Sequence, residues 1–252
     1  MSALAAIPTT HDEDWRYADA AVLATLTPDK LANWKTVDIA PGKTQRHTMV
    51  VGSAAPELHR IRIQVAEGAR AEMFVVNNGA AYTRVEVEVR LAKGAHFEFG
   101  GVTIGGGDAT REFVTRVDHA EPEATSSQII RSVHWGQAIG NFLGRIEVAR
   151  DAQKTDAEQN FRAILLEKGA SANTKPELEI FADDVKCAHG AAIGQLDQQA
   201  AFYMAARGLP PEVARKLLVQ AFVADAFTAM GEDGESARLL DTALATLGEA
   251  AL

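Results

Sequence analysis

Alternation of apolar and polar residues most constrains how this chain can fold. In residues 60–65 and again in 84–91, aliphatic side chains alternate with arginine, glutamate or glutamine. Successive side chains of a strand point to opposite faces, so the pattern predicts strands with one buried face. The β-like pattern extends from Thr36 to about Gly194, and helical periodicity is scarce within it. We therefore expect a mainly β protein.

A short internal repeat lies within this β region. Residues 65–74 resemble residues 91–99 at an offset of 26 residues. Repeats of about 20–50 residues are typical of stacked units such as the coils of a parallel β-helix. Antiparallel hairpins of a β-sandwich would produce the same similarity. The repeat by itself leaves both folds open.

Helices are predicted on both sides of the β region. Residues 12–26 begin with acidic side chains and are followed by Pro28, which we expect to end a short helix. Near the C-terminus, Asp197 is a plausible helix N-cap, Gly208 a stop, and Pro211 the first residue of a helix reaching about Met230. A last helix is expected over about 235–247. The predicted segments are 1–35, 36–194 (β core) and 195–252 (helical domain).

The predicted helix after Pro211 is apolar on more than one face. A surface helix normally has a single apolar stripe. This helix therefore either packs inside its own domain, the ordinary interpretation, or offers a surface to a partner. The residues in question are Leu217, Leu218, Phe222 and Phe227.

Charge and hydropathy exclude several classes of partner. Asp and Glu number 34 against 25 Lys and Arg, a formal charge of −9. Nucleic-acid binding requires clustered basic residues, and none are seen, so nucleic acid is not expected. No stretch approaches the ~18 apolar residues that cross a bilayer. The N-terminus lacks the basic start of a secretory signal. We expect a soluble, cytoplasmic protein without a membrane partner.

Cys187 and His189 form the most chemically distinctive pair. Cys187 is the single cysteine, which excludes an intrachain disulfide and a multi-cysteine metal site within this chain. At positions i and i+2 of an extended segment, a thiolate and an imidazole project to the same side. That combination suits iron or iron–sulfur ligation. The alternative is a buried structural cysteine beside a hydrogen-bonded histidine.

Other motifs are weaker evidence for a binding or catalytic site. Gly42-Lys43-Thr44 resembles the end of a phosphate-binding loop, but the residues that follow read as a strand. Gly105–Gly107 and the series Gly136, Gly140 and Gly144 match no dinucleotide fingerprint and are expected in turns. Asp183 and Asp184 are adjacent and would point to opposite faces of a strand, which favours a turn or edge position. His96 and Glu98 share a strand face and are expected to form a hydrogen-bonded or solvated pair.

Several ordered motifs in the second half resemble the SufB/SufD family of iron–sulfur cluster assembly proteins. The similarity is clear over about 115–230 and loose before that. Within the family, the Cys-x-His-Gly sequence at 187–190 and the segment 13–17 are most similar to SufD, although only about a dozen residues precede that segment. The motifs lie at 117–122, 127–128, 131–133, 142–146, 152–159, 175–190, 194–197 and 202–208.

The resemblance implies a right-handed parallel β-helix followed by a C-terminal helical domain. It implies a cytoplasmic, non-catalytic scaffold that pairs with a SufB-like subunit and docks SufC-type ATPases. His189 would then be a ligand of a nascent cluster or iron at the partner interface, and Cys187 a weaker candidate. Leu217, Leu218, Phe222 and Phe227 would belong to the ATPase-docking helix. No cofactor would be held permanently, and a transient iron–sulfur cluster would form at the shared interface.

Two other functions remain open at this point. A β-helix hydrolase acting on polysaccharide would use Asp183 or Glu179 as its acid, but aromatic residues make up only 6% of the chain. A structural homodimer would leave Cys187 and His189 inert. Unpaired strand edges at an open end of a β-helix also favour self-association of the isolated chain.

Overall fold

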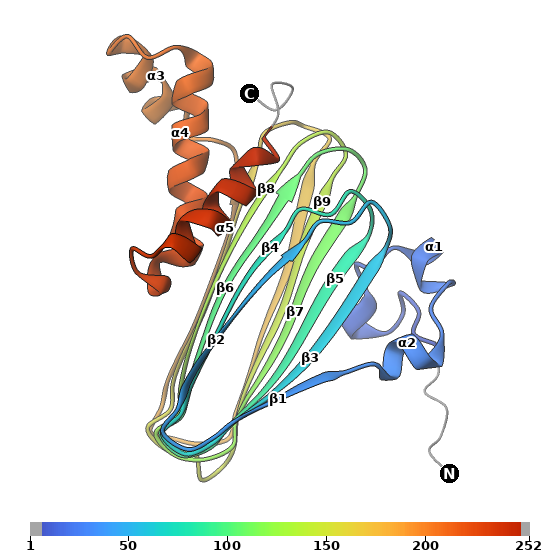
Figure 1. Cartoon of the computed structure of the whole chain (residues 1–252), viewed down its shortest axis with the longest axis vertical. Helices are drawn as coiled ribbons and strands as arrows, with labels where there is room; N and C mark the ends of the chain where they lie inside the picture. Colours follow the sequence, from blue (N-terminus) through green and yellow to red (C-terminus); the bar gives the residue numbers. More distant parts are fainter. Residues whose placement is uncertain (1–6, 248–252) are drawn as a thin grey trace.

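The computed structural model describes residues 7–247 and consists mainly of two parallel β-sheets of six strands each (Figure 1). One sheet contains the odd-numbered strands β1 (Lys35–Ile39), β3 (Glu57–Val65), β5 (Thr83–Leu91), β7 (Thr110–His119), β9 (Ile139–Val148) and β11 (Ser171–Ile180). The other contains β2 (Thr44–Val51), β4 (Arg70–Asn77), β6 (His96–Gly105), β8 (Thr125–His134), β10 (Asp156–Leu165) and β12 (Lys186–Gly194).

The chain passes from one sheet to the other after every strand, so each consecutive pair of strands forms one coil. We number the coils 1 (β1 and β2) to 6 (β11 and β12). Neighbouring coils are joined by parallel pairing in both sheets. The result is a parallel β-solenoid, which confirms the predicted β-helix and rules out the sandwich of antiparallel hairpins.

The 26-residue repeat corresponds to one turn of this solenoid. Val65 pairs with Leu91 in one sheet and Arg70 with His96 in the other. Between them, Gly68 and Gly94 occupy the same turn position with φ of +60° and +61°. The repeat was visible because these coils have equal lengths and the same turn glycine.

The interior of the solenoid changes character along its axis. In coils 2–4 it is filled by aliphatic and aromatic side chains, with Phe99 packed edge-on against Phe113 at 5.5 Å between ring centroids. Polar side chains also point inward: Asn77, Thr83 and Thr103 do so in coils 2 and 3, and more do so from coil 4 onward. The buried polar residues of this part include Arg111, Thr115, His119, Ser126, Gln128, Ser132, His134 and Gln159.

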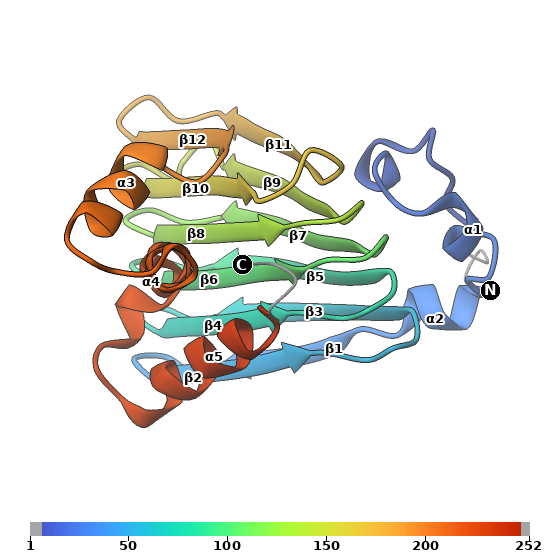
Figure 2. The ribbon, with the colours of Figure 1, turned by 90° about the horizontal axis from the view of Figure 1, so that it is seen from above.

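The C-terminal helices cover the outer face of the even-numbered sheet (Figures 1 and 2). They are α3 (Gln198–Ala206), α4 (Pro211–Ala224), the 3₁₀ helix η2 (Asp225–Met230) and α5 (Gly234–Ala245). Asp197 caps α3 as predicted, accepting hydrogen bonds from the N–H groups of Gln199 and Ala200. Val219, Val223 and Phe227 pack with Phe74 and Val102 of the sheet in one apolar cluster.

The N-terminal residues form three short helices on the outer face of the odd-numbered sheet (Figure 2). They are η1 (Glu13–Trp15), α1 (Ala20–Leu23) and α2 (Pro28–Ala32). The prediction of one helix over 12–26 ended by Pro28 is wrong. Pro28 instead begins α2, where its missing N–H is not needed, and Thr27 caps that helix.

Two expectations from the sequence concerned a membrane-spanning helix and a secretory signal. No helix within residues 7–247 is both long and apolar enough to span a bilayer. The first six residues, on which the absence of a secretory signal was partly judged, and the last five lie outside the described residues.

Candidate functional site

Cys187 and His189 lie on β12, the last strand of the even-numbered sheet. β12 pairs with β10, and its register places Cys187 beside Ala157 and His189 beside Gln159. Ala157 and Gln159 are both buried inside the solenoid. Because parallel in-register neighbours share a face, Cys187 and His189 are on the interior side of coil 6. The prediction that they share one side of an extended segment is confirmed.

Cys187 is half-buried at the apolar end of the solenoid. It packs against a cluster that includes Ile146, Ala157 and Ala182. Burial, and then the nearby carboxylate of Asp156, raise the pKa of the Cys187 thiol above its ordinary value. The thiol is therefore protonated at neutral pH in the isolated chain. A metal ion would have to displace that proton before the sulfur could ligate.

His189 is exposed, and the layer beneath it is polar. Gln159 crosses the interior of coil 5, and its Nε2 donates to the carbonyls of Gly144 and Glu177, each at 3.3 Å. A Cβ at Gly144 would lie 2.1 Å from Oε1 of Gln159, so only glycine leaves room for this crossing. His189 thus lies at the open end of the interior, next to the layer that the buried Gln159 amide crosses.

The end of the solenoid around these residues is open and apolar. β11 and β12 are the edge strands of their sheets, and within residues 7–247 no strand lies beyond them (Figure 2). Large apolar side chains are exposed there, among them Phe181 (57% exposed), Ile180 and Ile193. Edge strands with unpaired backbone groups and exposed apolar neighbours are suited to contact with another chain.

This end cannot supply a full set of metal ligands from the described residues. Over residues 7–247, no group of three or more His, Cys, Asp or Glu side chains is arranged to hold a metal ion. Cys187 and His189 could provide at most two donors, one soft and one borderline. Any metal held here would complete its coordination with groups from elsewhere.

The predicted docking residues divide into exposed and buried ones. Leu217 is exposed on α4, and Leu218 is partly buried. Phe222 is partly buried, with the guanidinium of Arg131 at 5.8 Å from its ring. Phe227 is only 3% exposed and contacts Phe74 edge-on at 6.5 Å, so its assignment to a docking surface is wrong. It attaches the helices to the sheet because η2 approaches the sheet closely.

Exposed apolar side chains on α3 lie beyond the set predicted from the sequence. Phe202 (76% exposed) and Tyr203 lie on α3, and Val213 joins Leu217 on α4. α3 and α4 pack against each other. Sequence reasoning missed Phe202 and Tyr203 because α3 shows no apolar stripe. The adjacent aromatic pair was the available signal. We call these four residues the α3–α4 surface.

The other motifs have structural roles. Gly42 lies in a turn at φ +65° and Thr44 begins β2, so no helix follows the lysine. Asp183 and Asp184 lie in the turn between β11 and β12, where Asp184 pairs with Lys154. His96 Nε2 lies 3.2 Å from the Glu98 carboxylate, as predicted. Gly107 and Gly136 are in turns, whereas Gly140 and Gly144 are inside β9, contrary to expectation.

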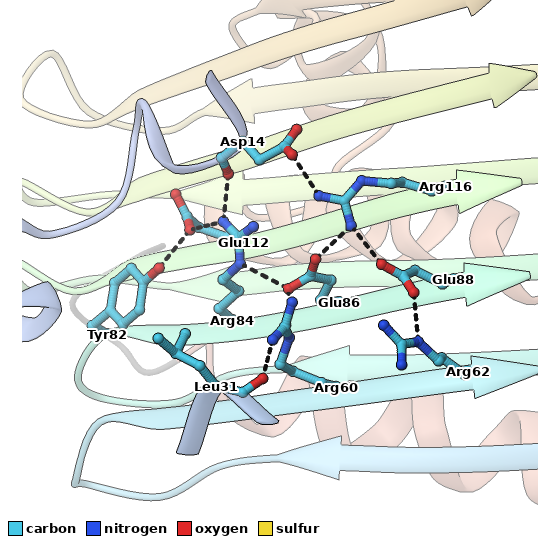
Figure 3. Close-up of polar contacts among 10 residues, drawn as sticks. All are labelled: Asp14, Leu31, Arg60, Arg62, Tyr82, Arg84, Glu86, Glu88, Glu112 and Arg116. Carbon is cyan, nitrogen blue, oxygen red and sulfur yellow. Dashed lines mark hydrogen bonds and ion pairs between the residues drawn. The ribbon is translucent and has the colours of Figure 1, made fainter. Parts of the chain in front are cut away.

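The segment Glu13–Tyr17 lies over a buried ionic network on the odd-numbered sheet (Figure 3). The guanidinium of Arg84 is completely buried beneath the Trp15 ring, at 3.7 Å from its centroid. Its Nη1 donates to the Asp14 carbonyl at 2.8 Å and to Glu112 at 3.2 Å. Lys175 pairs with Glu13 at 2.6 Å, which connects the segment to coil 6.

Strand register produces this network. Along the outer face, Arg60, Glu86 and Arg116 come from three successive coils, and Arg116 also pairs with Asp14 at 2.7 Å. Burial by itself would raise the pKa of the Glu86 carboxyl, but the three arginines outweigh it and lower that pKa. Glu86 is therefore ionised and neutralised at neutral pH. The network attaches the N-terminal segment to the solenoid.

Comparison with known proteins identifies the family. Residues 33–222 match the family model described as the SUF system FeS cluster assembly, SufBD core domain. SufD of Escherichia coli is 35% identical over 126 residues, 50% of this chain and 30% of that protein. A SufBD family protein of Synechocystis is 34% identical over 172 residues, 66% of this chain and 38% of the relative.

The chloroplastic protein ABCI7 of Arabidopsis thaliana is 44% identical over 109 residues, 42% of this chain and 22% of that protein. The chain therefore spans well under half the length of these three relatives. The family match, in contrast, includes every strand of the solenoid as well as α3 and most of α4. The chain belongs to the SufB/SufD family of iron–sulfur cluster assembly proteins and is SufD-like.

Proposed function

We propose that this chain is a non-catalytic scaffold subunit for iron–sulfur cluster assembly. Its coil 6 end binds a SufB-like subunit, and the α3–α4 surface docks a SufC-type ATPase. The observation that carries the proposal is the open, apolar edge formed by β11 and β12, with Cys187 and His189 on its interior side. The relatives from Escherichia coli and Synechocystis are named as iron–sulfur cluster assembly proteins, which supports the same function.

The chemistry of this end fits a shared cluster. His189 is exposed and offers an imidazole nitrogen, the commonest protein ligand for metals. Cys187 is half-buried with a raised pKa, which makes it the weaker ligand of the two. The remaining ligands would come from the SufB-like subunit. The cluster is then cargo that forms at the interface and leaves, and no cofactor is held permanently.

The α3–α4 surface fits a separate role, the docking of the ATPase. Because Phe227 and Val223 attach α4 and η2 to the even-numbered sheet, movement of a bound ATPase would be transmitted directly to the solenoid. The site of cluster formation and the ATPase surface would be connected through this sheet. A cytoplasmic location for the complex remains part of the proposal.

The experiment tests ligation and assembly separately. The chain is co-produced with a SufB-like protein and a SufC-type ATPase, as wild type and as His189→Ala. His11→Ala, which changes an exposed histidine far along the chain, is the matched control. We expect His189→Ala to assemble normally by size-exclusion chromatography with light scattering, and to lose most cluster absorbance on reconstitution.

Two outcomes would contradict parts of the proposal. Undiminished cluster formation by His189→Ala would remove its ligand role. Failure of the wild-type chain to bind the SufB-like protein, with only homodimers forming, would favour the structural homodimer instead.

A further inference from the structure

Arg111 points into the interior of the solenoid. It lies on β7 between Thr83 of β5 and Gly140 of β9, and it shares the inward face with the buried Phe113. Only 2% of Arg111 is exposed. An arginine is rarely so buried unless it is paired. A buried guanidinium inside a β-solenoid therefore calls for a charge partner.

No such partner exists among residues 7–247. Nε and Nη1 of Arg111 have no hydrogen-bond acceptor there, and burial alone, with no contribution from a nearby carboxylate, shifts its pKa. The equally buried Arg84 differs, since Glu112 and Glu86 neutralise it and Trp15 covers it. Burial lowers the pKa of Arg111 to about 10, which still leaves the side chain charged at neutral pH. An unpaired buried charge is costly.

The neighbours of Arg111 are neutral. Thr103 Oγ1 lies 2.9 Å from Ser132 Oγ and 3.2 Å from His134 Nε2. His134 Nδ1 donates to the Gly105 carbonyl at 3.1 Å, so Nε2 is the accepting nitrogen. Burial, and then the charge of Arg111, lower the pKa of His134 to about 3. We call Thr103, Arg111, Ser132 and His134 the Arg111 cluster.

The unsatisfied groups in and beside this cluster are N–H donors. Besides Arg111, the buried amide nitrogen of Asn77 lacks a partner among the described residues, and Asn77 is in register with Thr103. Glycine lets the chain close tightly over the guanidinium, because a Cβ at Gly105 would lie 2.3 Å from Nη2 of Arg111. The cluster thus combines one uncompensated positive charge with spare donors.

We propose that the Arg111 cluster binds one small monovalent inorganic anion, of halide size, inside coil 4. A single guanidinium matches a single negative charge, and N–H donors are the groups that coordinate anions. Adjacent coils are about 4.8 Å apart, which restricts the guest to one or a few atoms. Water would satisfy the donors but leave the charge uncompensated. The anion is a structural component of the solenoid, independent of cluster assembly at coil 6.

Stability measurements test this proposal in solution. Urea unfolding of the chain is followed while chloride replaces gluconate at constant ionic strength. A ligand of the native state stabilises by mass action. Above the dissociation constant, the unfolding equilibrium constant of the wild type should fall about tenfold per tenfold rise in chloride. In Arg111→Met the dependence should vanish.

Arg90→Met is the matched control, because Arg90 lies exposed on the outer face of the same sheet and pairs with Asp118. This variant should keep the chloride dependence of the wild type. An unfolding constant that is independent of chloride in the wild type, or equally dependent in Arg111→Met, overturns the proposal.

A second measurement stands even if Arg111→Met does not fold. Crystals of the wild-type chain soaked in bromide should give an anomalous peak within hydrogen-bonding distance of the Arg111 guanidinium. A water at that position without anomalous signal would show that solvent alone occupies the cluster, and would refute anion binding.

Discussion

Individual residues at the turns determine how regularly the coils stack. The first turn of coils 1–5 places one residue at positive φ: Gly42, Gly68 and Gly94 in coils 1–3, then Glu123 and Lys154 at φ 64° in coils 4 and 5. The N–H of each donates to a carbonyl of the next coil, as Glu123 does to Gln153 at 2.9 Å. The same conformation is thus required whether or not glycine is present.

Replacing Glu123 with glycine should therefore stabilise the protein. A Cβ in the left-handed region is strained, and glycine removes that strain at some cost in unfolded-state entropy. We expect Glu123→Gly to raise the free energy of unfolding by about 0.5–1 kcal/mol. Gly68→Ala should lower it by a similar amount, since nothing crowds a Cβ there. Urea denaturation at pH 7 measures both, and a destabilised Glu123→Gly would contradict the argument.

His119 makes stability depend on pH. It is buried beside Ser126, 3.0 Å from its hydroxyl, and burial is the main cause that lowers its pKa to about 4. The unfolded histidine titrates near 6.5, so between pH 6.5 and 4 the unfolded state binds the additional proton. Stability from this residue is complete above pH 6.5 and is lost as pH falls toward 4, by up to about 1.4 kcal/mol per pH unit.

The non-titrating variant His119→Gln isolates this contribution. Unfolding free energies at pH 7, 6, 5 and 4.5 should fall less steeply for His119→Gln than for wild type, by about one proton's linkage. A second non-titrating variant, His119→Asn, should give the same shallower slope. Parallel slopes in wild type and His119→Gln would show that His119 is not the group responsible.

At the scale of elements, α4 and η2 illustrate how one helix unit performs two tasks. A Cβ at Gly100 of β6 would lie 2.0 Å from the Ala226 carbonyl, so η2 approaches the sheet only because glycine stands there. This approach buries Phe227 against Phe74 and leaves Leu217 on the outside. The apolar side chains on one side of this helical unit attach it to the sheet, and those on the other side are exposed.

Substituting one residue on each side should distinguish attachment to the sheet from binding of the ATPase. Phe227→Ala is expected to cost about 3–5 kcal/mol of unfolding free energy, because it leaves a cavity between η2 and the sheet. Leu217→Asp, on the exposed side, should change stability by less than about 0.5 kcal/mol. It should nevertheless weaken co-purification of a SufC-type ATPase. Undiminished ATPase binding by Leu217→Asp would remove the α3–α4 surface from the proposal.

At the scale of the whole molecule, the coil 6 end of the solenoid differs from the two outer faces of its sheets. The sides of the sheets are covered, by the C-terminal helices on one face and by the N-terminal segment on the other (Figures 1 and 2). The coil 6 end instead presents edge strands and exposed apolar side chains within the described part of the chain. Association through this end would bury both at once.

A charge at this end should abolish assembly without unfolding the chain. Lysine on an edge strand opposes pairing with a further strand. Ile193→Lys, on exposed β12, is expected to leave the unfolding free energy within about 0.5 kcal/mol of wild type. It should abolish binding of the SufB-like subunit, measured by light scattering. Retained binding would place the interface elsewhere on the molecule.

Much of the fold followed from local patterns. Strict alternation over residues 84–91 identified a strand and its buried face, and the repeat at 26 residues reported one solenoid turn. Cap residues such as Asp197 marked a helix correctly, because caps act through their own backbone. Strand parity also placed Cys187 and His189 on one side. The family motifs, in turn, favoured the solenoid over the sandwich.

Contacts between distant segments could be decided only by the tertiary structure. Nothing local to Phe227 distinguishes a residue that packs on Phe74 from one that faces solvent. Pro28 begins a helix because Thr27 caps it and the segment packs on the sheet, which the proline itself does not reveal. Likewise, the sequence around Arg111 does not distinguish it from an arginine on the exposed face of a strand. In the stacked coils Arg111 points inward, and its charge has no partner among residues 7–247. The register between neighbouring strands decides which side chains share the interior.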